Sequence, residues 1–294
     1  MLAFVFPGQG AQKRGMGQKL FDTVKEFTAV EAEVDAILGY SMRKLCLEDP
    51  NNQLVQTQFT QPALYVVNAL HYYEARAEGA RPQFVAGHSV GEYDALLAAG
   101  AFDFLTGLRL VKKRGELMAQ ARDGGMAAVI GLDAERVARV LREENLTALD
   151  VANFNAPAQT VISGPLDDVK RAAAAFEKAG AKLYMPLPVS AAFHSRYMAP
   201  AAKEFGAFLA SFHFRPLQIP VIANLTGQPY PDGDPTTAIR SILEQQITGS
   251  VQWTESVRYL LRRGVTSFRE VGPAVVLTRL IQQIQEAETA AAIR

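Results

Sequence analysis

Short apolar runs alternate with amphipathic stretches along most of the chain, a pattern typical of proteins whose parallel strands are connected by helices. Before residue 124, the pattern predicts strands at 2–6 and 84–86 and helices at 16–38, 62–78, 92–99 and 104–122. After residue 194, it predicts strands at 220–224 and 267–271 and helices at 196–212, 236–247, 252–263 and 274–286. We therefore expect an α/β domain with a largely parallel sheet, and a tail at 289–294 that frays.

Residues 125–194 show a different pattern. Short strands are predicted at 126–130, 149–152, 160–163 and 182–187, and helices at 133–144 and 166–179. A turn is expected around Asn155-Ala156-Pro157. The order β-α-β-β-α-β is typical of a ferredoxin-like unit. We therefore predict a large domain formed by residues 1–124 and 195–294, interrupted by a small ferredoxin-like subdomain at 125–194.

Composition narrows the possible functions. The 294 residues include 30 Lys and Arg against 30 Asp and Glu, which argues against nucleic acid as a partner because phosphate binding needs a basic excess. The single cysteine, Cys46, excludes an internal disulfide framework and a cysteine-based zinc site, and it fits a reducing cytoplasm. The first apolar run is too short for a signal peptide, and no run is long enough to span a membrane.

The segment Gly87-His88-Ser89-Val90-Gly91 stands between a predicted strand and a predicted helix. This strand, turn and helix form the context in which Gly-x-Ser-x-Gly marks a nucleophile. The residue at the apex adopts a strained backbone, and a Cβ at either flanking glycine would collide with the neighbouring element. Ser89 is therefore the candidate nucleophile, and a tight turn without chemistry is the alternative.

A nucleophilic serine needs a base, and histidine is the usual one. His194 is the preferred candidate because it lies where the small subdomain returns to the large domain, over a cleft. His88 adjoins Ser89 but is expected to point away from it and to buttress the turn. His71 is expected to be structural or exposed, and His213 to pack between phenylalanines.

Further groups are expected around the serine and the histidine. No aspartate stands out as the orienting group, so a carbonyl near Gln252 is expected to hold the histidine. The oxyanion hole would use the amide of Val90 and one from the loop Gly8-Gln9-Gly10. A phosphate loop is the rival interpretation of that loop, but position 13 is Lys13 instead of a third glycine, and no Gly-Lys-Ser/Thr follows.

Six motifs together resemble one family. They are, in order, Phe6-Pro7-Gly8-Gln9-Gly10-Ala11-Gln12, Thr60-Gln61-Pro62-Ala63, Gly87-His88-Ser89-Val90-Gly91-Glu92, Arg114-Gly115-Glu116-Leu117-Met118, Phe193-His194-Ser195 and Val251-Gln252-Trp253. Over nearly its whole length the chain resembles malonyl-CoA:acyl-carrier-protein transacylases, and more narrowly the stand-alone acyltransferases that serve modular polyketide synthases in trans. The resemblance implies a large α/β-hydrolase-like domain beside the ferredoxin-like subdomain.

The resemblance also implies roles for single residues. Ser89 would carry the acyl ester and His194 would act as the base. The amides of Gln9 and Val90 would form the oxyanion hole, and the carbonyl of Gln252 would orient the histidine.

A second group of residues would bind the substrate. Arg114 would form a bidentate pair with the free carboxylate of the malonyl group, whereas without the resemblance it would be taken for a solvated arginine in a basic run. Asn153 and Asn155 would line the cleft from the small subdomain, although an asparagine before Ala-Pro is also an ordinary turn residue. His88 would also belong to this group of substrate-binding residues. Phe193 would exclude an α-methyl group, because its ring stands beside the base.

The leading hypothesis is an acyltransferase of polyketide or fatty acid biosynthesis that moves a malonyl group through an acyl-serine. Malonyl-CoA would be the donor and a phosphopantetheinylated carrier protein the acceptor, with no bound cofactor and no metal. The alternative is a hydrolase, either a general esterase or a proofreading thioesterase acting on carrier proteins. A non-catalytic docking subunit is a third hypothesis, which the intact serine and histidine disfavour. We expect a cytoplasmic monomer that binds neither nucleic acid nor membranes.

Overall fold

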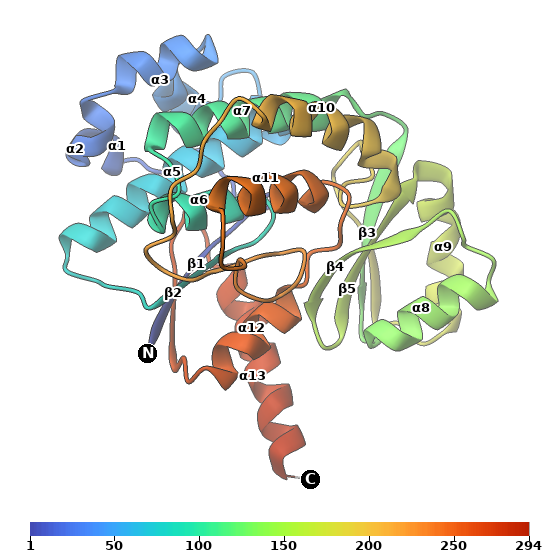
Figure 1. The fold of residues 1–294 in the computed structure, drawn as a ribbon. Coiled ribbons are helices and arrows are strands. Elements are labelled where there is room, and N and C mark those ends of the chain that lie inside the picture. The colour runs from blue at the N-terminus through green and yellow to red at the C-terminus, as the bar shows by residue number, and fades with distance from the viewer. Residues whose placement is uncertain (294) are drawn as a thin grey trace.

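The computed structural model describes residues 1–293 and contains a parallel and an antiparallel sheet (Figure 1). The parallel sheet has the order β7-β2-β1-β8, formed by β1 (Leu2–Phe6), β2 (Phe84–Gly87), β7 (Val221–Ile222) and β8 (Ser267–Glu270). The antiparallel sheet has the order β4-β5-β3-β6, formed by β3 (Gly124–Ile130), β4 (Asp150–Ala156), β5 (Gln159–Pro165) and β6 (Leu183–Pro186). The predicted fold class is confirmed.

Helices cover both faces of the parallel sheet, which explains why its central strands, β1 and β2, read as continuous apolar runs. Along β1, Phe4 and Phe6 enter one core, whereas Ala3 and Val5 enter a second core on the opposite face. The helices of the first core include α5 (Thr57–Ala77), α6 (Gly91–Ala98), α7 (Phe104–Gln120), α10 (Ala199–Leu209) and α11 (Pro235–Gln246). Those of the second core are α12 (Trp253–Arg262) and α13 (Leu277–Ile293).

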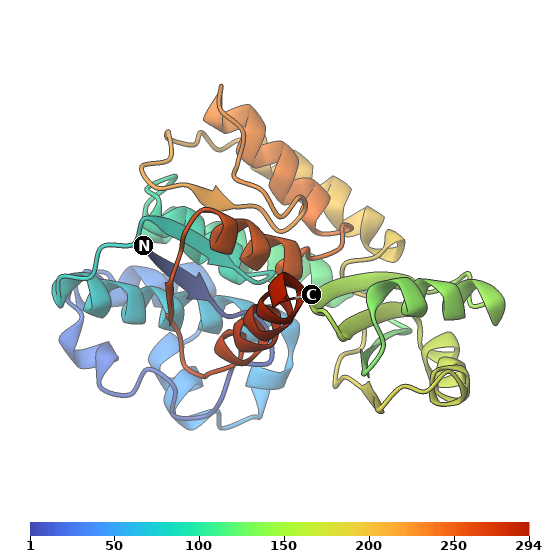
Figure 2. The same ribbon diagram turned by 90° about the horizontal axis from the view of Figure 1, so that it is seen from below.

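The antiparallel sheet stands to one side of the molecule, as the green-to-yellow segment in Figures 1 and 2 shows. Its helices are α8 (Ala134–Glu143) and α9 (Leu166–Lys178), and they pack on a core of their own that includes Val129 and Phe176. The element order β3-α8-β4-β5-α9-β6 is the predicted one. The turn expected around Asn155-Ala156-Pro157 lies slightly later in the chain, because β4 continues through Ala156, which pairs with Gln159. Only residues 157 and 158 connect the two strands.

The single helix expected at 16–38 is also wrong. The structure has three short helices there, α1 (Leu20–Thr23), α2 (Lys25–Thr28) and α3 (Glu31–Leu38). Phe21 and Phe27 are fully buried and meet edge to face, with their ring centroids 5.1 Å apart. Residues six apart in one helix point about 120° away from each other. The extended backbone of Val24 brings the two rings together, so tertiary packing overrides the helical pattern.

Several boundaries also differ from the predictions. Helix α5 begins at Thr57 instead of residue 62, and α4 (Met42–Glu48) and a 3₁₀ turn, η1 (Gln53–Val55), were not predicted. The helix expected at 196–212 is divided into a 3₁₀ turn, η2 (Arg196–Met198), and α10. Within residues 1–293, no helix combines the length and apolar character needed to cross a bilayer.

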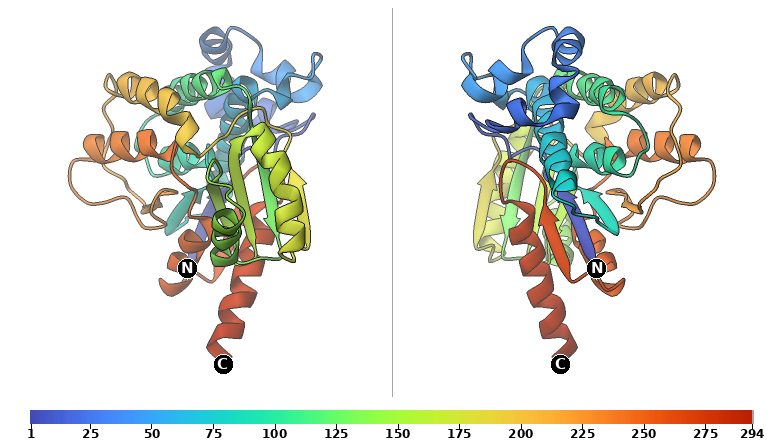
Figure 3. Two further views of the ribbon diagram at one scale, coloured as in Figure 1. Left: turned by 90° about the vertical axis from the view of Figure 1, so that its right-hand side faces the viewer. Right: turned by 90° about the vertical axis from the view of Figure 1, so that its left-hand side faces the viewer.

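The predicted frayed tail is helical up to Ile293, and Arg294 lies outside the described residues. Helix α13 begins at Leu277 and extends away from the body of the molecule in both views of Figure 3. The Arg258 Nε donates to Glu288 Oε1 over 2.7 Å, and Thr289 Oγ1 donates to the Gln285 carbonyl over 2.8 Å. These contacts hold the end of the helix.

Candidate active site

The turn between β2 and α6 places Ser89 at its apex with a left-handed backbone, φ 51°. An added Cβ on Gly87 would lie 1.9 Å from the Gly91 carbonyl oxygen, and one on Gly91 would lie 2.2 Å from the Phe6 carbonyl oxygen. The steric demand predicted for the two glycines is therefore present. Asn224 fastens the turn, because its Oδ1 accepts from the Ser89 amide over 2.6 Å and its Nδ2 donates to the Gly87 carbonyl over 2.5 Å.

His194 meets this turn from the segment that leaves the small sheet. Its Nε2 lies 2.8 Å from Ser89 Oγ, and its side chain is buried. Its Nδ1 contacts the carbonyl oxygens of Gln246 and Gly249, at 2.9 and 3.1 Å. Carbonyls only accept hydrogen bonds, so Nδ1 holds the proton and Nε2 presents a lone pair to the serine.

The surroundings of His194 also set its charge. Burial lowers its pKa to about 3, and the positive charge of Arg114 and the neighbouring His88 add to this effect. The imidazole is therefore neutral at physiological pH, which is the form that can accept the serine proton.

The prediction that the Gln252 carbonyl orients the histidine is wrong. Gln252 precedes the first turn of α12, and its carbonyl accepts from the amide of Ser256 over 2.9 Å. The carbonyls that hold His194 come from the end of α11 and the loop after it, at Gln246 and Gly249. Sequence reasoning missed both residues, because a main-chain acceptor leaves no signal in residue type.

Arg114 of α7 is fully buried, so the solvated arginine of the alternative interpretation is excluded. Its Nη1 donates to Gln61 Oε1 over 2.7 Å, and its Nη2 donates to Gln246 Oε1 over 3.0 Å and to Ser89 Oγ over 3.2 Å. The guanidinium and the imidazole of His194 thus converge on one hydroxyl. Gln61 had no assigned role, although it stands inside the motif Thr60-Gln61-Pro62-Ala63.

A cavity of about 100 Å³ opens at the serine. The predicted residues that line it are Gln9, His88, Ser89, Val90, Asn153, Phe193 and His194. It shares Met118, Val189 and Phe193 with a neighbouring hollow of about 670 Å³. A third hollow of about 550 Å³, beside Arg122 and Glu204, is lined by neither Ser89 nor His194.

Asn155 does not line this cavity, contrary to the prediction. Its Oδ1 lies 2.8 Å from His88 Nε2, so it holds the ring of His88, which also packs against Trp253 with 5.7 Å between ring centroids. Burial lowers the pKa of His88. The strand position of Asn155 in β4, instead of a turn, is what directs it to His88.

The loop after β1 packs closely against the serine turn. An added Cβ on Gly8 would lie 2.4 Å from the His88 carbonyl oxygen, and Asn68 Nδ2 donates to the Pro7 carbonyl over 3.0 Å. Across residues 1–293, neither the Gln9 amide nor the Val90 amide donates to a protein acceptor. Two unpaired amides beside the nucleophile suit an oxyanion.

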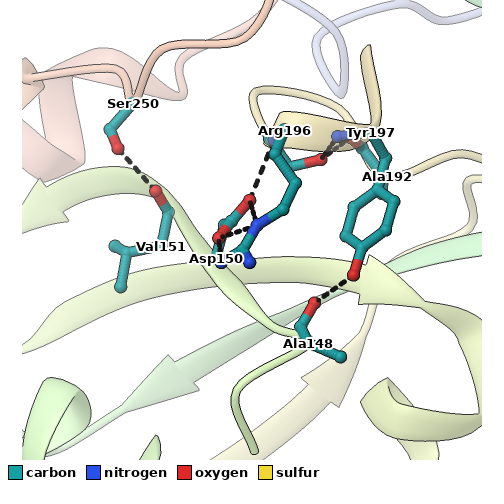
Figure 4. Close-up of polar contacts among 8 residues, drawn as sticks. Ala148, Asp150, Val151, Ala192, Arg196, Tyr197 and Ser250 are labelled. Carbon is teal, nitrogen blue, oxygen red and sulfur yellow. Dashed lines mark hydrogen bonds and ion pairs between the residues drawn. The ribbon is translucent and has the colours of Figure 1, made fainter. Parts of the chain in front are cut away.

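Polar contacts fasten the small sheet to Arg196 and Tyr197, which follow the histidine in the chain, and to Ser250 (Figure 4). The Asp150 carboxylate accepts from the Arg196 amide and from its Nε, both over 2.9 Å. Tyr197 Oη donates to the Ala148 carbonyl over 2.9 Å. Ser250 Oγ donates to the Val151 carbonyl over 2.6 Å. The loop that supplies the carbonyls for the histidine is therefore tied to β4.

The chain is similar to known proteins over nearly its whole length. A family model described as "Acyl transferase domain" matches residues 3–293. The chain is 54% identical over 288 residues to the polyketide biosynthesis malonyl CoA-acyl carrier protein transacylase PksC of Bacillus subtilis (strain 168), covering 97% of this chain and 98% of that protein.

Solved structures are similar over nearly the whole chain. A malonyl CoA-acyl carrier protein transacylase from Burkholderia pseudomallei has a TM-score of 0.91 and 49% identity, with 97% of this chain and 98% of that chain covered. The PlMCAT:AntF structure is described as a type II PKS acyl-carrier protein in complex with its malonyl-transacylase. It has a TM-score of 0.91 and 37% identity, with 97% of this chain and 93% of that chain covered.

Proposed function

The chain belongs to the acyl transferase domain family, and we propose that it transfers a malonyl group from malonyl-CoA to the phosphopantetheine thiol of an acyl carrier protein. One observation carries this proposal. His194 Nε2 and Arg114 Nη2 both lie within hydrogen-bond distance of Ser89 Oγ, at 2.8 and 3.2 Å. A base and a cation at one hydroxyl suit a nucleophile that takes up an acyl group bearing a carboxylate.

The first half-reaction forms the acyl-enzyme. His194 Nε2 accepts the proton of Ser89 Oγ while the oxygen attacks the thioester carbonyl of malonyl-CoA. The developing oxyanion accepts hydrogen bonds from the amides of Gln9 and Val90. The imidazolium then returns its proton to the departing CoA sulfur, and the malonyl ester remains on Ser89.

The second half-reaction runs the same steps with the carrier-protein thiol. His194 takes the thiol proton, the sulfur attacks the ester carbonyl, and Ser89 regains its proton as it leaves. Throughout, Arg114 pairs with the malonyl carboxylate, because its planar fork matches a carboxylate better than a lysine would. Asn153 and Phe193 shape the cavity at the acyl group.

The finer features of the protein belong to the same proposal. The large catalytic domain comprises residues 1–124 and 195–294, and the small subdomain comprises 125–194. The protein acts as a monomer in the cytoplasm on carrier domains of a polyketide or fatty acid synthase, without cofactor, nucleic acid or membrane. The buried Cys46 and the balanced charge support the compartment and the choice of partner. No observation favours the hydrolase alternative.

Mass spectrometry tests the proposal directly. The protein is mixed with malonyl-CoA, and a mass increase of one malonyl group is expected, mapped to Ser89 and discharged by a phosphopantetheinylated carrier protein. Ser89→Ala should fold and remain unmodified. A malonyl adduct on that variant would refute the role of Ser89. Release of free malonate that exceeds carrier loading would indicate a hydrolase.

A further inference from the structure

Arg114 is a fully buried cation without a contacting carboxylate. Within the described residues, no Asp or Glu oxygen lies within 4.0 Å of its nitrogens, and its partners are the neutral side chains of Gln61, Gln246 and Ser89. A buried charge left alone is costly. The nearest acidic residue in this hydrogen-bond network is separated from Arg114 by one side-chain amide.

That acid is Glu92, which is fully buried on α6, three positions after Ser89. Three donors converge on its carboxylate. Tyr230 Oη donates to Oε1 over 2.5 Å, and the Asn224 amide and Gln246 Nε2 donate to Oε2 over 3.0 and 2.7 Å. Burial raises the pKa of Glu92, whereas the three hydrogen bonds and the charge of Arg114 oppose this shift and favour the charged form.

The side chain of Gln246 links Glu92 to Arg114. Its Nε2 donates to Glu92 and to the Ser89 carbonyl, and its Oε1 accepts from Arg114. The acceptors on one side and the guanidinium on the other fix the orientation of the amide. A carboxylate at position 246 in place of this amide would pair directly with the guanidinium of Arg114.

We infer that Glu92 is a positioning residue that sets the preference for acyl groups with a free carboxylate. It balances the charge of Arg114 through the Gln246 amide, and this spacer keeps any protein carboxylate from pairing directly with Arg114, so that the substrate carboxylate can do so. The inference rests on the proposed role of Arg114 in binding the malonyl carboxylate. The inference predicts that the preference for malonyl over acetyl changes when the negative charge in this network is removed or moved closer to Arg114.

The experiment measures single-turnover acylation of Ser89 by malonyl-CoA and by acetyl-CoA and compares their ratio between variants. Glu92→Gln removes the balancing charge, so Arg114 should attract a carboxylate more strongly and the malonyl-to-acetyl ratio should rise on the order of tenfold. Gln246→Glu places a carboxylate on Arg114 and should lower the ratio by a similar factor. The main-chain carbonyl of residue 246, which holds His194, is unchanged in that variant.

The double variant Glu92→Gln/Gln246→Glu keeps the charge of the native network but moves it one amide closer to Arg114. Its ratio should remain as low as that of Gln246→Glu, while its thermal stability should approach that of the native protein. Asp94→Asn is the matched control, because Asp94 is a buried acid on the same helix that contacts Asn68 instead of Gln246. It should leave the ratio unchanged.

A purely structural role would lower both rates by one factor, so equal losses for the two substrates in Glu92→Gln would overturn the inference. An unchanged ratio in Glu92→Gln, or an equal shift in Asp94→Asn, would also overturn it. If Glu92→Gln does not fold, Gln246→Glu becomes the deciding variant, and an unchanged malonyl-to-acetyl ratio in it would overturn the inference.

Arg114→Ala, measured in parallel, should lower the malonyl-to-acetyl ratio. If it does not, the proposed role of Arg114 fails. If it does while Glu92→Gln has no effect, only this inference fails.

Discussion

Ser89 and His194 are 105 positions apart, yet Ser89 Oγ and His194 Nε2 lie 2.8 Å from each other, and both residues have left-handed backbones, with φ 51° and 55°. Non-glycine residues in this region cost on the order of 1–3 kcal/mol each and cluster where the surrounding structure holds them for a purpose. Here the two strained residues point their side chains at one another. The backbone of each half of the site is therefore adapted to this single contact.

Replacement of the base tests that contact. His194→Ala should lower the single-turnover rate of acylation by malonyl-CoA at least ~10²-fold, the lower range for losing a positioned general base. The fold should persist. Stopped-flow release of CoA measures the rate, with His88→Ala as the matched control. An unchanged rate in His194→Ala would transfer the role of base to His88.

The low pKa of His194, about 3, predicts an unusual pH profile. Because the imidazole stays neutral, acylation should keep its plateau from about pH 8 to about pH 5, without the loss near pH 6.5 expected of an ordinary histidine. Arg114→Met removes a charge that lowers this pKa, so the acid limb with acetyl-CoA should move to higher pH. A half-maximal rate near pH 6.5 in the native protein would contradict the burial argument.

Stability should follow the same pKa. Between the unfolded value of 6.5 and the folded value of about 3, only the unfolded chain binds a proton at His194. Stability contributed by this group is therefore present above pH 6.5 and decreases as the pH falls through that window. Urea unfolding at several pH values measures the slope.

Truncation of Arg114 should separate acyl groups by charge. Arg114→Ala should weaken malonyl transfer by roughly 2–5 kcal/mol, the range for removing one partner of a buried charge pair. Acetyl transfer should change little or improve, because acetyl has no carboxylate to leave unpaired. Both acyl groups are compared at matched enzyme concentration, with free acid and carrier-bound product counted. Equal losses would mean that Arg114 supports the fold and does not read the substrate.

The ring of Phe193 should select by size. It is buried and lines the cavity together with Ser89 and His194. Phe193→Ser should raise the use of methylmalonyl-CoA relative to malonyl-CoA by ~10-fold, because one methyl group in a pocket is worth about 1–3 kcal/mol. Competition between the two donors measures the change. If the malonyl preference persists, the steric barrier lies elsewhere, and Val90 is the next residue to replace.

Local patterns determined a large part of this protein. Alternating apolar runs and helical spacing predicted the parallel sheet, the βαββαβ insertion and most helices, because each element depends on neighbours close in sequence. The sequence Gly87-His88-Ser89-Val90-Gly91 likewise determined the serine turn, since the glycines, the apex and the flanking elements lie within a few residues.

Only the tertiary structure decided which groups meet at the serine. The carbonyls of Gln246 and Gly249 hold His194, where the sequence had indicated Gln252, because any residue type can offer a main-chain acceptor. The burial of Arg114 depends on α5, α6 and α11 closing around α7, and a basic run in one helix does not encode that. The division of the N-terminal helix arose in the same way, from contact between rings that no local pattern could bring together.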